Sequence, residues 1–316
     1  MKIFEREVRK SGRCVYRVAG VKLFSIRKPP VGPIRPQGDP VVVIRIPSEE
    51  VGLFCHFNYS LAWMRWAEER GYRSYVDMRT PLNVFNHGKP IDYNPWDVYF
   101  RQEVDAADIA DAKKVLTTTF CRNPPKFPGV LEELDQGNPE FVRWREFTQR
   151  HIAYSDAMAK LVDEREAALF KGEKVLGCLV RGTDYARMKP KGHPVQPTAE
   201  QVIADAKQVC VERGIKKVFL ATEDKTIREK FLQAFGDDIL SGQTDLPDYK
   251  GDFLVKSGAL GDSANTLRIS TQYFVSIALL ARCSCMLAGC ASGTVSAAIL
   301  SKGFDLMRIY NLGYYG

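Results

Sequence analysis

The six-residue segment 180–185 (VRGTDY) has an arginine and an aspartate three positions apart. It follows the apolar run 175–179, which predicts a buried parallel strand, so Arg181, Thr183 and Asp184 are expected at a strand's carboxyl end. Open α/β sheets bind their ligands at that edge. Arginine offers a planar set of N–H donors suited to a phosphate pair, and the aspartate can orient it or accept a proton. An ordinary strand-end ion pair is the alternative interpretation.

A second polar turn follows the apolar stretch 217–221, where Thr222, Glu223 and Asp224 end the run VFLATED. Polar acceptors at this position can bind a ribose or a base edge. Asp224 is equally suited to cap the helix predicted to begin at Lys225. The two strand ends are expected to be neighbours at one crevice.

A third turn, GCASGTV, lies between the predicted strand 284–288 and a helix of small residues. Small residues let the backbone approach a ligand. The hydroxyls of Ser292 and Thr294, the backbone at Gly293 and the first N–H groups of the helix together form a potential anion site. Turns of this composition are common before helices, so the motif gains weight only beside the other two.

The rest of the chain predicts the elements that position these turns. A proline-rich linker precedes a first strand, 41–46, and the second half alternates strands with helices, which is typical of a parallel, doubly wound sheet. We expect a basic arm and linker at 1–37, an α/β unit at 38–170 and a second α/β unit at 171–316. The predicted elements are a helix at 58–70, a strand at 75–78, a long surface loop at 80–100, a helical region at 139–169, strands at 175–180, 217–221, 284–288 and 304–309, and helices at 198–213, 225–235, 266–282 and 293–301.

Composition limits the class of protein. The 316 residues are 45% hydrophobic and 26% charged, as in a globular protein with a full core. Neither an uninterrupted apolar run of about 18 residues nor a secretory h-region is present, so a cytoplasmic location is expected. The eight cysteines form no CxxC pair and have no histidine cluster beside them, which predicts reduced thiols and no metal site.

Positive charge is concentrated near the N-terminus. Residues 1–37 contain ten Lys or Arg and two Glu, whereas the whole chain has a net charge of +7, so the remainder is nearly neutral. Apolar residues between these cations suit contact with an anionic membrane surface, although a disordered or core-docked arm explains them too. No nucleic-acid recognition motif accompanies the basic segment, so a nucleic-acid partner is not expected. The chain also lacks GxGxxG after its first strand and lacks GxxxxGKS, which disfavours the glycine-fingerprint dinucleotide fold and the P-loop nucleotidases.

The three motifs in this order, VRGTDY with a downstream His-Pro, LATED and ASGTV, resemble those of the inverting fucosyltransferase superfamily, which includes α1,6- and protein O-fucosyltransferases. The resemblance covers about residues 175–302. It implies a GT-B-like fold of two facing Rossmann-like units with mostly parallel sheets, and a GDP-sugar bound mainly by the C-terminal unit. Weaker similarity around Gly52, Phe54 and Asn58 implies that a turn and a helix there face the donor phosphates and the acceptor.

Site residues follow from this resemblance position by position. Arg181 matches the diphosphate-binding arginine and Asp184 the aspartate of the same motif, while 222–224 match the nucleoside-contacting strand end and 292–294 the phosphate-side turn. Leu179 replaces a histidine, Tyr185 a lysine and Lys189 lies near the position of a glutamate. Asp184 and His193 are therefore the two candidates for the general base.

The predicted function is sugar transfer, most readily of fucose from GDP-fucose to a surface glycan or a lipid-linked precursor. Arginine and helix-terminus amides can stabilise the departing diphosphate without a metal ion or other cofactor. Two alternatives stay open: a nucleotide-sugar-binding protein without catalysis, and another nucleotide-sugar enzyme such as an epimerase.

Overall fold

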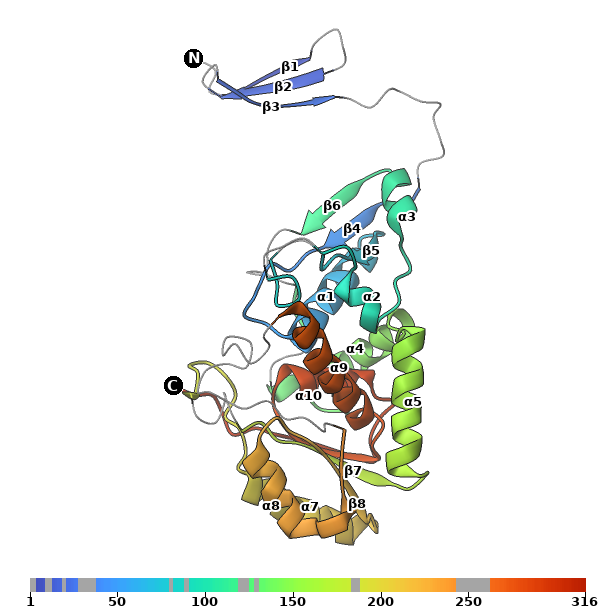
Figure 1. Ribbon diagram of the computed structural model, residues 1–316, viewed down its shortest axis with the longest axis vertical. Helices are drawn as coiled ribbons and strands as arrows, with labels where there is room; N and C mark the ends of the chain where they lie inside the picture. Colours follow the sequence, from blue (N-terminus) through green and yellow to red (C-terminus); the bar gives the residue numbers. More distant parts are fainter. Residues whose placement is uncertain are drawn as a thin grey trace.

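The computed structural model reveals three sheets, two of them parallel, with helices between and around them (Figure 1). The structure describes residues 4–8, 13–18, 21–27, 38–79, 82–87, 91–118, 125–127, 131–182, 188–242 and 262–316.

The basic segment contains a three-stranded antiparallel sheet in the order β1-β2-β3. The sequence had predicted an arm with no assigned elements, yet the strands coincide with its Val, Ile, Phe and Tyr residues, which favour extended backbone. Contact of this segment with a membrane stays a prediction. The strands are β1 Phe4–Val8, β2 Arg13–Val18 and β3 Val21–Arg27.

The N-terminal α/β unit is built on a parallel sheet in the order β5-β4-β6, so the first strand of the unit is central. α1 connects β4 to β5 and begins at Leu53, earlier than the predicted residue 58, because Gly52 already serves as its N-cap. The elements are β4 Val41–Ile44, α1 Leu53–Glu68, β5 Arg73–Val76, α2 Pro95–Tyr99, α3 Ala106–Asp111 and β6 Val115–Thr118. Neither α3 nor β6 was predicted.

The predicted surface loop at 80–100 is wrong. Its aromatic residues Phe85, Trp96, Tyr99 and Phe100 are fully buried, and α2 lies within it. Asn94 connects the segment to β5 and the residues after it through hydrogen bonds. Its Oδ1 accepts from the Met78 amide at 3.0 Å, and its Nδ2 donates to the Val76 carbonyl at 2.7 Å. A composition rich in Asn and Pro suggested exposure, whereas the asparagines satisfy backbone groups inside the unit.

Two helices join the units and together span the predicted helical region. α4 Pro139–His151 is capped by Asn138, and α5 Asp156–Phe170 is capped by Ser155, whose side chain accepts from the Met158 amide. This second cap divides the predicted helical region 139–169 into two helices. A short 3₁₀ turn, η1 Leu131–Glu133, precedes them.

The C-terminal unit is a five-stranded parallel sheet in the order β11-β10-β7-β8-β9, which confirms the predicted α/β class with parallel sheets. β8 and α8 have the predicted bounds, and the other predicted elements shift by one to three residues. β9 is additional. The elements are β7 Val175–Leu179, α7 Ala199–Arg213, β8 Lys217–Ala221, α8 Lys225–Phe235, η2 Gly236–Asp238, β9 Ile239–Ser241, α9 Ser263–Leu280, β10 Cys285–Gly289, α10 Ser292–Leu300 and β11 Leu306–Tyr310.

One hydrophobic core runs through both α/β units. It extends from Ile44 in β4 and Phe57 in α1, through Phe274 in α9 and Ala298 in α10, to Met286 in β10. Figure 1 shows α9 and α10 between the sheet that contains β4 to β6 and the sheet that contains β7 and β8. A second cluster, built around α7 and α8, covers the other face of the C-terminal sheet.

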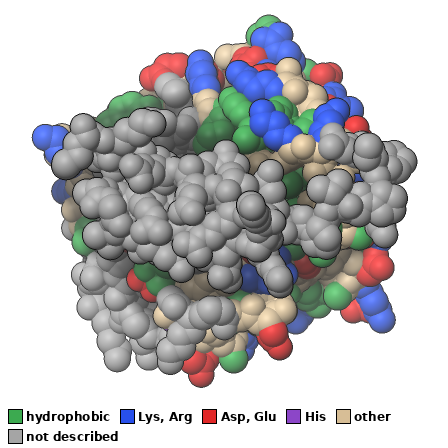
Figure 2. Space-filling view, turned by 90° about the horizontal axis from the view of Figure 1, so that it is seen from above, with side chains coloured by type: hydrophobic (Ala, Val, Ile, Leu, Met, Phe, Trp, Pro, Cys, Tyr) green, Lys and Arg blue, Asp and Glu red, His purple; other side chains and the backbone are tan. Residues whose placement is uncertain are grey.

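No described helix has the length and apolar content needed to cross a membrane. On the face shown in Figure 2, the described Lys and Arg side chains are interspersed with acidic and hydrophobic ones. That mixture agrees with the nearly neutral charge of the sequence beyond residue 37.

Candidate functional site

The strand order places a topological switch point in the C-terminal unit. The chain begins the sheet at β7, continues to β8 on one side, and later returns to β10 on the other side of β7. Connections leaving β7 and β10 therefore diverge at the carboxyl edge, which is where open parallel sheets form their ligand-binding crevice. The turns after β7 and β10 both lie at this edge, as the sequence predicted.

Arg181 follows β7 and forms an ion pair with Glu223, which follows the adjacent strand β8. The Arg181 Nε to Glu223 Oε1 distance is 3.0 Å, and the two side chains are only 14% and 10% exposed. Glu223 Oε1 also accepts from the Gly182 amide at 3.2 Å. The predicted meeting of the two strand ends is confirmed, and Glu223 is an orienting partner of Arg181. Thr183 and Asp184 lie outside the described residues.

Asp224 caps α8. Its Oδ1 accepts from the amides of Thr226 at 2.8 Å and Ile227 at 3.1 Å, and Thr222 Oγ1 accepts from the Asp224 amide at 3.2 Å. Both side chains are buried. The capping alternative considered from the sequence is thus the observed geometry, while nucleotide contact by these two residues stays a prediction.

The turn before α10 is tightly packed. Thr294 is fully buried and its hydroxyl donates to the Gly289 carbonyl. A Cβ at Gly293 would lie 2.2 Å from Tyr273 Oη, so close packing of α9 on α10 accounts for this glycine. α10 has no side-chain cap at its N-terminus. Backbone amides of the first turn, together with Ser292, are therefore the groups of this motif best suited to an anion.

Gln196, buried at 7% exposure, ties the His193 loop to the crevice. Its Nε2 donates to the Cys290 carbonyl at 2.8 Å and to the Pro194 carbonyl at 3.1 Å, while its Oε1 has no partner in the structure. The sequence assigned no role to Gln196. Its hydrogen bond to Cys290, at the end of β10, joins residues far apart in the chain, so no local pattern predicts it.

The His193 loop is also paired with residues near the end of the chain. The Tyr315 amide donates to the His193 carbonyl at 2.9 Å, and the Gly192 amide donates to the Tyr315 carbonyl at 2.8 Å. Tyr315 Oη accepts from the Gln196 amide at 3.3 Å. These bonds fix the backbone that positions the His193 side chain, and no sequence signal pointed to Tyr315.

Gly289→Ala is expected to displace the Gln196 segment. A Cβ at position 289 would lie 2.2 Å from Gln196 Oε1 and 2.9 Å from Pro197 Cδ. Overpacking of this kind costs about 1–3 kcal/mol of unfolding free energy. The urea midpoint of unfolding should fall and GDP should bind more weakly. Gly137→Ala, whose Cβ would meet only Asp135 Oδ1 at 3.3 Å, serves as the control. Unchanged stability and ligand binding in Gly289→Ala would contradict the close approach.

The three predicted residues of the N-terminal unit occupy the boundary between the units. Gly52 begins α1, and Phe54 is 2% exposed, with its ring 5.4 Å from that of Tyr273. Asn58 Nδ2 donates to the Ser292 carbonyl at 3.1 Å, and its Oδ1 accepts from Ser296 Oγ at 2.7 Å. The side chains of Phe54 and Asn58 thus pack the units together, and their contact with a donor stays a prediction.

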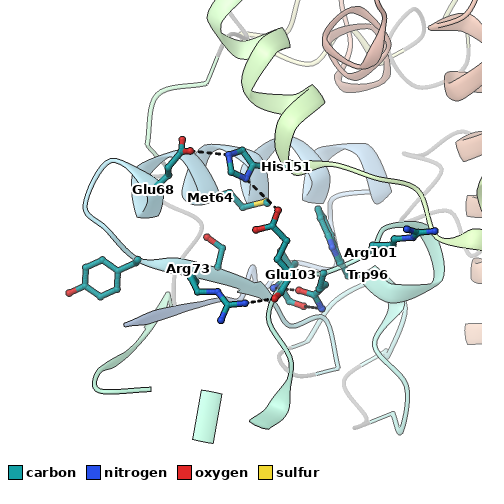
Figure 3. Close-up of a pocket in the computed structure, with 11 residues that line it drawn as sticks. Met64, Glu68, Arg73, Trp96, Arg101, Glu103 and His151 are labelled. Carbon is teal, nitrogen blue, oxygen red and sulfur yellow. Dashed lines mark hydrogen bonds and ion pairs between the residues drawn. The ribbon is translucent and has the colours of Figure 1, made fainter. Parts of the chain in front are cut away.

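An open pocket of about 200 Å³ lies elsewhere, at the amino end of β5 (Figure 3). Its polar residues are largely paired with one another or with neighbours: His151 Nε2 lies 3.0 Å from Glu68 Oε1, and Arg73 Nη1 lies 2.9 Å from Asp108 Oδ1. None of the predicted site residues lines it. This pocket is therefore separate from the crevice at the C-terminal sheet.

The described residues contain no cluster of metal ligands, and burial affects two of the thiols nearest the candidate site. No group of three or more His, Cys, Asp or Glu side chains there could hold a metal ion. Burial raises the pKa of Cys290 to about 12, and it raises the pKa of Cys178 as well. Thiols of this kind are poor nucleophiles at neutral pH.

No family model matches the chain, and the search of curated proteins found no significant match. Among solved structures, fucosyltransferase NodZ from Bradyrhizobium matches with a TM-score of 0.49 and 15% identity over 89% of this chain and 97% of that one. NodZ α-1,6-fucosyltransferase soaked with GDP-fucose matches with a TM-score of 0.45 and 14% identity, over 84% and 93% of the two chains. POFUT1 in complex with GDP-fucose matches with a TM-score of 0.48 and 10% identity, over 87% and 98%. These similarities assign no residue or substrate to this chain.

Proposed function

We propose that this protein is a glycosyltransferase that uses a GDP-sugar, with GDP-fucose as the donor, and inverts the configuration of the transferred sugar. The observation that carries the proposal is Arg181, held by Glu223 at the carboxyl edge of β7 beside the switch point. The ordered resemblance of the three strand-end motifs supports the choice of donor.

Sugar transfer from a nucleoside diphosphate requires stabilisation of negative charge on the departing phosphates. The Arg181 guanidinium, which forms an ion pair with Glu223, and the uncapped amides at the start of α10 would supply it from the two sides of the crevice. A positioned guanidinium costs little reorganisation during the reaction, which is the basis of electrostatic catalysis.

Inversion also requires an acceptor hydroxyl to lose a proton as it attacks the sugar carbon from the opposite face. We propose His193 as the general base, because its backbone is fixed by Tyr315 and because imidazole accepts protons near neutrality. Asp184 is the alternative base. The acceptor we propose is a surface glycan or a lipid-linked precursor, reached at the cytoplasmic face of a membrane by the basic segment that contains β1 to β3.

A nucleotide panel tests the donor. Purified protein should gain thermal stability with GDP and not with UDP, ADP or CMP, since a ligand at about 100 times its dissociation constant adds about 2.7 kcal/mol. GDP-fucose should then be turned over, by transfer or by slow hydrolysis. Stabilisation by GDP without any turnover would identify a binding protein, and stabilisation by none of the four would refute the proposal.

Turnover is expected to persist in EDTA. The positive charge needed at the diphosphate is supplied here by Arg181 and backbone dipoles, so chelation should leave the initial rate of GDP release within about twofold of the untreated rate. The measurement compares chelated enzyme with and without added Mg²⁺ or Mn²⁺. Loss of activity that either ion restores would show that a metal shares the role given to Arg181.

A further inference from the structure

The N-terminal unit has a switch point of its own. β4 is its first and central strand, with β5 on one side and β6 on the other, so the carboxyl ends of β4 and β6 flank a second divergence of the chain. Arg45 and Thr118 meet there: Thr118 Oγ1 accepts from the Arg45 amide at 2.8 Å and donates to the Arg45 carbonyl at 3.1 Å. A parallel sheet offers this edge to ligands.

One buried carboxylate holds two arginines at this edge. Asp77, 2% exposed, follows β5; its Oδ2 accepts from Arg45 Nε at 2.9 Å and forms an ion pair with Arg45 Nη2 at 2.7 Å. Its other oxygen accepts from the Arg79 amide at 3.1 Å and from Arg79 Nε at 3.3 Å. These bonds outweigh burial and lower the pKa of Asp77, so it stays ionised and fixes both guanidinium groups.

The guanidinium groups keep donors for a ligand. Arg45 Nη1 and both Nη atoms of Arg79 have no recorded protein partner in the structure, and the side chains are 39% and 43% exposed. Two guanidinium groups share the single carboxylate of Asp77, which leaves one net positive charge before Asp97 is counted. An ion pair that served stability alone would need one arginine, not two with outward-facing forks.

Two further residues bear on the charge of this cluster. Asp97 lies within electrostatic range of Arg79 and Asp77, its carboxylate accepts from Gln102 Nε2 at 2.6 Å, and burial raises its pKa. The Arg79 guanidinium also lies 6.0 Å from the centre of the Tyr75 ring. Asp97 therefore opposes anion binding and provides a way to tune it.

We propose that Arg45 and Arg79, positioned by Asp77, form a phosphate-binding site on the N-terminal unit, separate from the donor crevice. Three outward N–H-bearing nitrogens fixed by one carboxylate match the several acceptor oxygens of a phosphate group better than the two of a carboxylate. The phosphate site itself does not depend on the proposed function. If the protein is the proposed glycosyltransferase, the bound phosphate is part of the acceptor, which is a phosphorylated saccharide or a phosphate-linked lipid carrier.

The test is an NMR titration of the ¹⁵N-labelled full chain with inorganic phosphate, followed through arginine Nε–Hε signals, in the presence of saturating GDP. We expect saturable shifts with a dissociation constant on the order of 1 mM. Arg79→Gln should weaken binding about tenfold, and Asp97→Asn should tighten it about threefold because one opposing charge is removed. Arg143→Gln, at an exposed ion pair with Glu140, is the matched control and should change nothing.

Three results would overturn the inference. Phosphate that binds without GDP but is displaced by GDP belongs to the donor crevice, and acetate that binds as tightly as phosphate rules out phosphate as the ligand class. Equal binding by Arg79→Gln and wild type removes the role of the arginines. If Arg79→Gln is unfolded, Arg79→Lys keeps the charge without the fork and should still weaken binding. Failure of GDP to bind would instead refute the proposed donor, while the phosphate titration still decides this site.

Discussion

Replacing Arg181 by lysine is expected to lower kcat/KM for sugar transfer by about 10²–10³-fold while the fold stays intact. Glu223 forms an ion pair with the Arg181 guanidinium, whose planar set of N–H donors lysine lacks, so the ammonium would keep the charge and lose the two-pronged geometry. Removing one preorganised group from a developing anion costs about 2.7–4 kcal/mol of transition-state stabilisation. Steady-state kinetics with GDP-fucose measure the effect.

The matched control is Arg213→Lys in the last turn of α7, which makes the same chemical change away from the crevice. It should leave kcat/KM and the unfolding midpoint as in wild type. Near-normal transfer by Arg181→Lys would show that Arg181 does not contact the diphosphate. A large drop in stability of that variant would instead show that the ion pair is mainly structural.

Phe274→Ala is expected to reduce the free energy of unfolding by about 3–5 kcal/mol and to do so for both α/β units at once. Phe274 is fully buried in α9, and its ring lies 5.0 Å from Tyr154, 5.2 Å from Tyr99 and 5.5 Å from Phe100. Because these rings belong to the core shared by both sheets, their loss should weaken the whole body.

Urea unfolding followed by tryptophan fluorescence and by far-UV circular dichroism measures this. The two signals should change together, in the variant as in the wild type. Leu232→Ala, at a side chain 43% exposed on α8, is the control and should cost less than about 1 kcal/mol. Separate transitions for the two signals would show that the units unfold independently.

The C-terminal half was predictable because its elements are locally marked. Asp224 caps α8 and Gly214 ends α7 in a left-handed conformation, and both residues stand at the predicted boundaries. That the ends of β7 and β8 would be neighbours followed from the rule that adjacent parallel strands end at one edge, whereas the ion pair of Arg181 with Glu223 was not predicted. Local caps and strand-end rules depend on neighbours in sequence, which a single chain reveals.

Features that depend on distant partners were missed. The segment with Phe85 and Trp96 looked like a surface loop because its asparagines resemble turn residues, whereas those side chains bond backbone groups across the unit. The packing of Tyr273 in α9 against Gly293 was not foreseen either, and phosphate contact at Gly293 stays a prediction. Asp77, between Arg45 and Arg79, has no pattern in sequence that marks it as buried.

The amide of Asn58 spans the boundary between the units, bonded at one end to the Ser292 carbonyl and at the other to Ser296 Oγ. Exchange of the N-terminal unit for that of another protein of this fold would break both bonds and bury unpaired polar groups. A working chimera therefore has to carry α1 and α10 as a matched pair. The point of recombination therefore has to lie outside both α1 and α10.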